Sequence, residues 1–214
     1  MAYKGLYGVY YALAHVTDGI VDGYTGGIKT MGKAISASFE PNTTDDNPLY
    51  ANDAVAENDA SGASGGTLTM TLDTLSMEAA ADMYGLEVAD ASVNVGQSPG
   101  TSVQGKGLKY TGTEQSAPVG VAYMRTQQIN GVTSYEVLLY RRVIFGMPAS
   151  EAQTKGESIE WQTPEIEGTV FGREGDGTNA WFEQMTFPTL PAATQYVTDY
   201  FAKTPPDDED GGGG

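Results

Sequence analysis

The chain has 214 residues, with 28 acidic and 11 basic side chains, a formal net charge of −17 and no cysteine. A surface this negative repels nucleic-acid phosphates, which excludes a basic nucleic-acid-binding protein, and the lack of cysteine excludes a disulfide-stapled secreted domain. No apolar run reaches the roughly 18 to 20 residues of a membrane span, and the N-terminus leads into no signal-peptide core. We therefore expect one soluble domain that folds in the cytosol.

The first segments favour β-structure. Aromatic and apolar residues alternate over Leu6 to Ala14, which predicts a strand with a bulge at Gly8. Turns are predicted at Asp18-Gly19 and Asp22-Gly23. Small and apolar residues then alternate from Lys33 to Glu40, which predicts a further strand.

Residues 41–66 form an acidic segment that is rich in asparagine and small residues. A structureless segment of this length inside a compact domain is usually functional or disordered, and this one lacks the apolar side chains for a core of its own. We expect it to order against another molecule, and we nominate as assembly residues Asn42, Asp45, Asp46, Leu49, Tyr50, Asp53 and Val55. Its acids lack the Asp-x-Asp-x-Asp-Gly spacing of calcium loops, so we expect solvated acids here and not a metal site.

The remaining segments add strands and two short helices. Ser76 to Tyr84 has helical spacing, with Ser76 as N-cap and Gly85 as C-terminal stop. The strongest strands flank Asn130-Gly131, the best short hairpin signal. Further strands are predicted over 67–73, 87–95, 105–110, 119–128, 133–146, 158–171 (interrupted by Pro164) and 180–186, and a second helix over 192–203.

About eight strands and two short helices predict a mainly β fold, either a β-sandwich or a partly closed barrel with helices at its margins. Neither an internal repeat nor a linker divides the chain. We expect one domain over residues 1–204, followed by an acidic, glycine-rich tail over 205–214 that we expect to be disordered.

Little in the sequence indicates catalysis. His15 is the single histidine, which leaves no His and Cys ligand set for a metal centre. No nucleophile elbow is present, and Gly23 to Thr30 departs from phosphate-loop spacing because Ile28 separates Gly27 from Lys29. We therefore expect neither enzymatic activity nor a cofactor, although the many acids leave a hydrolase with a carboxylate pair open as an alternative.

Three cations stand near the strongest strand. Arg141 and Arg142 close it, and Lys155 precedes the next strand. Arginine forks suit carboxylates, so two interpretations remain: the cations balance a strand face of their own chain, or they pair with acidic loops of a neighbouring subunit.

Five blocks of sequence follow one another in a distinctive order: Tyr10-Tyr11-Ala12, Gly32 to Asn42 (GKAISASFEPN), Leu49 to Asp53 (LYAND), Leu68 to Leu72 (LTMTL), and Thr154 to Pro164 (TKGESIEWQTP) with Glu167-Gly168-Thr169 after it. In order and spacing they resemble the major tail proteins of siphophages, the family that builds long non-contractile tail tubes. The resemblance covers residues 5–187.

The resemblance implies the tail-tube fold, a β-sandwich subunit of hexameric rings that stack into a virion tube, assembled in the bacterial host cytoplasm. It implies as partners further copies of the chain and the tape-measure, tail-terminator and tail-tip proteins, while DNA passes through the lumen without specific binding and no membrane is involved. An acidic lumen would repel DNA and let it slide, but the sequence does not identify the acids that face it. The alternative from another class is a surface β-sandwich module for adhesion or carbohydrate binding.

Overall fold

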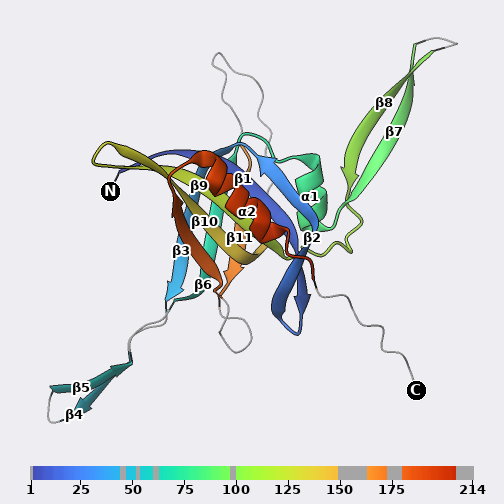
Figure 1. Cartoon of the computed structure of the whole chain (residues 1–214). Helices are drawn as coiled ribbons and strands as arrows, with labels where there is room; N and C mark the ends of the chain where they lie inside the picture. The colour runs from blue at the N-terminus through green and yellow to red at the C-terminus, as the bar shows by residue number, and fades with distance from the viewer. Residues whose placement is uncertain are drawn as a thin grey trace, which may run out of the picture.

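The computed structural model describes residues 2–43, 47–51, 54–59, 63–96, 100–148, 163–172 and 180–205, and in them twelve strands and two helices (Figure 1). All strand pairs are antiparallel, which confirms the mainly β prediction. The elements are β1 (Ala2–Thr17), β2 (Ile20–Gly32), β3 (Ala34–Thr43), β4 (Asn47–Ala51), β5 (Ala54–Asp59), β6 (Ala63–Leu72), α1 (Met77–Tyr84), β7 (Glu87–Val95), β8 (Thr101–Lys109), β9 (Val119–Ile129), β10 (Val132–Phe145), β11 (Glu165–Phe171), β12 (Phe182–Phe187) and α2 (Leu190–Phe201).

Eight strands form the main sheet, in the order β2-β1-β9-β10-β11-β6-β3, with β12 also paired to β10. The long strand β10 divides this sheet, because its residues 135–140 pair with β12 and its residues 143–145 pair with β11. A register shift between Tyr140 and Val143 marks the irregularity that separates the two segments. Only Lys33 separates β2 from β3, so the chain passes directly between the two ends of the sheet. This arrangement is consistent with a β-sandwich.

The main core contains fully buried side chains from both parts of the sheet, among them Tyr11, Leu68 and Phe145. Helix α1 adds Ala79 and Met83 to the same cluster. The predicted caps of this helix are confirmed: the Ser76 hydroxyl accepts a hydrogen bond from the Ala79 amide at 3.1 Å, and Gly85 adopts the left-handed conformation with φ 65°.

Helix α2 covers the other face of β1, β9 and β10 (Figure 1). Val197 and Phe201 are buried there, and a Cβ on Gly120 would lie 2.5 Å from the Phe201 ring, so glycine permits this close packing. The helix begins two residues before the predicted 192–203 span, because Thr189 is its N-cap and a proline occupies its first turn.

The β9–β10 hairpin is confirmed, and both turn residues have positive φ, 49° at Asn130 and 81° at Gly131. The predicted turn at Asp22-Gly23 is wrong, since both residues lie in β2, with Gly23 paired to His15. A Cβ on Gly23 would lie 2.3 Å from the Pro205 backbone nitrogen. This glycine therefore serves the packing of the segment after α2 and not a turn.

The prediction of a structureless segment over 41–66 is wrong for its described part. Residues 41–43 continue β3, residues 63–66 begin β6, and Thr43 pairs with Ala63. Between them β4 and β5 pair with each other and extend away from the main sheet (Figure 1). Cross-strand pairing satisfies backbone hydrogen bonds without a core, which composition alone does not reveal. The predicted tail over 205–214 lies outside the described residues except for Pro205.

A second two-stranded hairpin, β7–β8, also extends from the body (Figure 1). The prediction for 87–95 is confirmed, and the strand predicted over 105–110 is longer and begins at Thr101. Neither described helix is long and apolar enough to cross a membrane.

Candidate assembly surface

Two edges of the main sheet are open. Among the described residues, β3 pairs only with β6 and β12 pairs only with β10. At the far end, β2 is partly covered by the segment after α2, where the Tyr24 amide donates to the Lys203 carbonyl at 2.8 Å. The outer edges of β3 and β12 are therefore the places where another strand can join the sheet.

The outer face of β3, β6 and β11 carries an ordered polar ladder. Its cross-strand rows are Ser36–Thr71–Glu165, Ser38–Thr69–Glu167 and Glu40–Thr67–Thr169. Ser36 Oγ donates to Thr71 Oγ1 at 3.0 Å, and the residues from β3 and β11 in these rows are exposed. The three rows, which we call the acidic ladder, contain three carboxylates and no Lys or Arg. This face presents hydroxyls and negative charge together.

The arginine pair of β10, Arg141 and Arg142, is engaged within its own chain. Arg141 donates to the Val21 carbonyl, and the Tyr24 hydroxyl donates to the Arg141 carbonyl at 3.1 Å. Arg142 Nη1 donates to the Gly19 carbonyl at 3.0 Å, and its guanidinium lies 4.4 Å from the centre of the Phe171 ring. Both arginines thus hold the β1–β2 hairpin against β10, which favours the intrachain interpretation.

The other nominated assembly residues fall into three groups. Asn42 is exposed in β3, while Leu49 and Tyr50 lie in β4 and Val55 lies in β5, with Tyr50 opposite Val55. The structure therefore brings part of the nominated set onto the β4–β5 hairpin. Outside the described residues lie Asp45, Asp46, Asp53 and Lys155.

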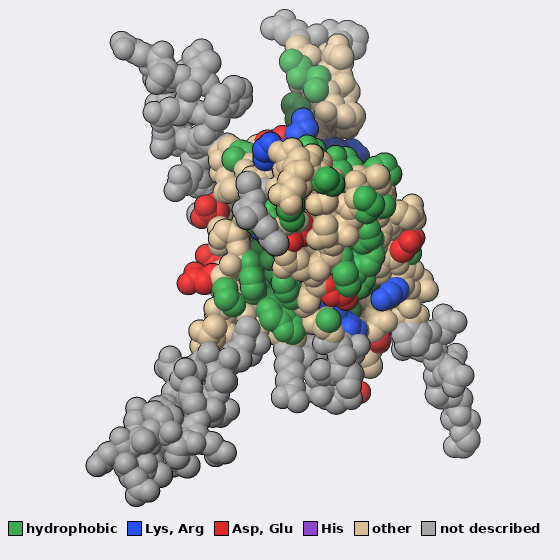
Figure 2. Space-filling model, turned by 60° about the vertical axis from the view of Figure 1, so that its left-hand side comes forward, with side chains coloured by type: hydrophobic (Ala, Val, Ile, Leu, Met, Phe, Trp, Pro, Cys, Tyr) green, Lys and Arg blue, Asp and Glu red, His purple; other side chains and the backbone are tan. Residues whose placement is uncertain are grey.

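A patch of exposed apolar side chains lies where β1 and β10 begin and β9 ends. Tyr3 in β1 is opposite Gln127 in β9, and Ile129 in β9 is opposite Val132 in β10. Gln127 and Ile129 are two residues apart in one strand and therefore point to the same side of the sheet. Tyr3, Ile129 and Val132 thus share one face. Their exposed fractions are 44%, 42% and 69%. We call these three residues the strand-end patch. Figure 2 brings this side of the molecule forward and shows hydrophobic side chains exposed on it.

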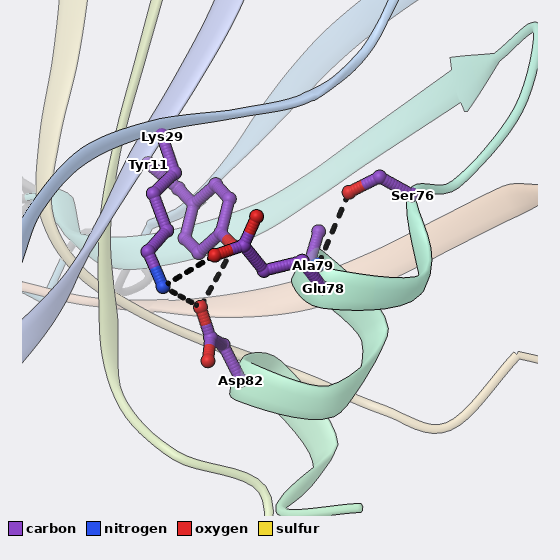
Figure 3. A network of polar contacts seen from close by, with 6 residues as sticks. All are labelled: Tyr11, Lys29, Ser76, Glu78, Ala79 and Asp82. Atoms are coloured by element: carbon purple, nitrogen blue, oxygen red, sulfur yellow. Dashed lines mark hydrogen bonds and ion pairs between the residues drawn. The ribbon is translucent and has the colours of Figure 1, made fainter. Parts of the chain in front are cut away.

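Helix α1 is tied to the sheet by a polar network that the sequence did not reveal (Figure 3). Asp82 Oδ2 accepts hydrogen bonds from the Tyr11 hydroxyl and from Lys29 Nζ, both at 2.8 Å, and Lys29 Nζ lies 3.0 Å from Glu78 Oε1. The hydrogen bonds to Asp82 and Glu78 raise the pKa of Lys29, and burial followed by the hydrogen bond to Asp82 raises the pKa of Tyr11. The only sequence signal is the four-residue spacing of Glu78 and Asp82, which places both on one helix face.

We expect Asp82→Ala to lower the free energy of unfolding by about 1 to 3 kcal/mol, because the buried Tyr11 hydroxyl loses its acceptor. The matched change Glu78→Ala should cost less than about 1 kcal/mol, since that carboxylate is 68% exposed and its ion pair is screened. Urea unfolding of both variants at neutral pH measures the difference. Equal losses would show that Asp82 is not the anchor of the helix.

A second polar cluster fixes the edge strand β12. Glu136 is 3% exposed and accepts hydrogen bonds from Arg125 Nε and from Gln184 Nε2. Arg125 in turn lies 3.7 Å from the centre of the Tyr3 ring. These contacts connect β1, β9, β10 and β12 and set the position of the open β12 edge.

His15 has a local partner. Its Nδ1 lies 2.7 Å from Asp22 Oδ1, and the Thr17 hydroxyl donates to Asp22 Oδ2 at 2.7 Å. All three residues belong to the β1–β2 hairpin. Across the described part of the chain, no group of three or more His, Asp or Glu side chains is arranged to hold a metal ion.

Comparison with known proteins adds no identification. No protein-family model matches the chain, and a search of curated proteins finds no match either.

Proposed function

We propose that this chain is the structural subunit of a phage tail tube, which self-assembles into stacked hexameric rings. The proposal joins the sequence resemblance to the major tail proteins of siphophages with an antiparallel β body whose β3 and β12 edges are open. A head-to-tail interface that closes produces a ring, and its axial repetition produces a filament. The tape-measure, terminator and tail-tip proteins are the further partners in this proposal.

The acidic ladder is the observation that supports this function most. We assign it to the wall of the lumen, because it belongs to the part of the sheet that ends at the open β3 edge. Sheets joined there edge to edge would bring copies of Glu40, Glu165 and Glu167 around one bore. DNA inside would meet carboxylates and hydroxyls and no Lys or Arg from these rows, so it would slide without binding.

Screening limits the reach of this repulsion. At physiological salt the Debye length is about 8 Å, so only carboxylates that face the bore act on the DNA. The net charge of −17 therefore matters less for passage than the placement of these three acids.

We expect the triple change Glu40→Gln, Glu165→Gln and Glu167→Gln to leave tube formation intact and to slow DNA ejection severalfold in particles that carry it. The control Asp18→Asn, Glu114→Gln and Asp199→Asn removes the same charge from outside the ladder and the β7–β8 hairpin and should leave ejection unchanged. Ejection followed by single-particle fluorescence compares the two. Equal ejection rates in both variants and in the unchanged chain would show that the ladder does not line the lumen.

Negative-stain microscopy of the purified chain at rising concentration tests the proposed function as a whole. Rings or tubes of uniform width support it. Monomers that persist across salt and concentration contradict it.

A further inference from the structure

The β7–β8 hairpin, which we call the arm, has two chemically different faces. Its register has no shift from Glu87 opposite Lys109 to Val95 opposite Thr101, so residues directly opposite one another share a face. One face carries, toward the tip, Ala91, Val93, Val95, Thr101, Val103 and Gly105. The other face is polar, and there Ser92 Oγ lies 2.7 Å from Ser102 Oγ and accepts from Gln104 Nε2 at 3.0 Å.

Within the described part of the chain, the apolar face of the arm is uncovered. Val93, Val95 and Val103 are 60%, 58% and 51% exposed, and Figure 2 shows hydrophobic side chains along the arm at the top of the molecule. Among the described residues, the arm is anchored at its base, where Leu108 packs on the main core. An isolated two-stranded hairpin is marginal in water and needs a third layer or strand against its apolar face. The three valines therefore mark a contact that the described residues of the chain do not complete.

The strand-end patch offers the complementary surface. In Figure 1 the arm leaves one side of the body, while the N-terminus and the β9–β10 turn lie on the opposite side. The arm therefore cannot cover the strand-end patch of its own chain. Two complementary patches on opposite sides of one molecule form a head-to-tail contact between copies, and each copy then offers a free arm and a free patch to the next.

Charge also favours a second copy as the occupant. The strands of the arm carry Glu87 and Asp90 against Lys106 and Lys109, so they are neutral in a chain of net charge −17. Copies of so acidic a chain repel one another, and a neutral arm makes contact with the least repulsion. Lys109 Nζ lies 3.9 Å from Glu87 Oε1 at the base, away from the valines.

We propose that the apolar face of the arm docks on the strand-end patch of a second copy of this chain, with Val93, Val95 and Val103 against Tyr3, Ile129 and Val132. This inference rests on the proposed self-assembly and names the surfaces that carry it. It assigns to the arm a role that the sequence did not suggest, since the residues nominated from sequence lie elsewhere.

The first test replaces Val93, Val95 and Val103 with threonine, which keeps the shape and strand preference of each side chain and makes it polar. The matched control is Val88→Thr, which is 47% exposed on the polar face of the same arm. Sedimentation velocity should show the threshold concentration for assembly rising about tenfold or more in the triple variant. The control should assemble as the unchanged chain does, and circular dichroism verifies that both variants fold.

The second test uses the absence of native cysteine. One population carries Val103→Cys and another, with a different tag, carries Val132→Cys. A short bismaleimide should link the two populations, whereas Val88→Cys in place of Val103→Cys should give only background.

The outcomes separate the two proposals. A raised threshold with cross-linking between populations supports the contact. Assembly at the unchanged threshold without cross-linking overturns the contact and leaves the tube proposal standing. Cross-linking in a chain that never forms rings or tubes supports the contact and overturns the tube. Neither assembly nor cross-linking overturns both.

Discussion

A chain that lacks the β4–β5 hairpin should fold as a monomer and form no tubes. The design replaces residues 44–62 with Asn-Gly, because Thr43 and Ala63 are paired neighbours at the ends of β3 and β6. A two-residue turn of this sequence closes antiparallel strands without strain. Removing a long connection also lowers the entropy cost of closing it, so the free energy of unfolding should stay the same or rise slightly.

The reason for the expected loss of assembly is the geometry of this hairpin. β4 and β5 pair only with each other among the described strands and extend away from the body (Figure 1). A hairpin placed so can reach a neighbouring subunit or ring. Thermal unfolding and electron microscopy of the same preparation measure fold and assembly separately.

A control variant separates the effect of the hairpin strands from the effect of the length of the connection. It replaces residues 44–62 with a Gly-Ser linker of equal length, which keeps the connection and removes the strands. We expect this variant also to remain unassembled. If either variant forms tubes like the unchanged chain, the hairpin has no part in assembly.

Phe201→Ala should cause the largest loss of stability among the changes considered, about 3 to 5 kcal/mol. Phe201 is 1% exposed, and its ring centre lies 4.9 Å from that of Tyr24 in an edge-to-face contact. Truncation leaves a cavity between α2 and the sheet, beside Gly120, which has no side chain to fill it. Such a loss is a large part of the total stability of a typical domain, about 5 to 15 kcal/mol.

The comparison for this change is Phe187→Ala at the end of β12, where the ring is only half-buried. Its cost should be clearly smaller, and Phe201→Leu should cost less than about 1.5 kcal/mol because it conserves most of the volume. Urea unfolding of all three variants gives the ranking. A Phe201→Ala variant as stable as Phe187→Ala would show that α2 is not held by this packing.

The sequence predicted the elements whose periodicity or caps are local. Strict alternation located the second half of β6, Asn130-Gly131 located the β9–β10 hairpin, and Ser76 with Gly85 located α1. In each case the side chains that decide the structure lie within a few residues of one another.

Prediction from the sequence failed where residues far apart in the chain determine the local structure. Gly23 suggested a turn, but its role is set by the close approach of Pro205. The composition of residues 41–66 suggested a loop, because cross-strand pairing leaves no apolar signal when a hairpin lacks a core.

The candidate surface was equally hard to foresee. The acidic ladder depends on the registers that align β3, β6 and β11, and the anchor of α1 joins Lys29 to Asp82, 53 positions later. The amphipathic pattern of β7 is visible in the sequence, whereas its lack of cover appears only in the fold.

Electron microscopy of end-on and side views of the assembled chain tests the central claim most directly. The account predicts rings of six subunits around an open bore, stacked into tubes of constant width, with β3, β6 and β11 facing the bore in the reconstruction. A chain that stays monomeric at every concentration and salt tested, or an assembly in which Glu40, Glu165 and Glu167 face outward, would contradict it.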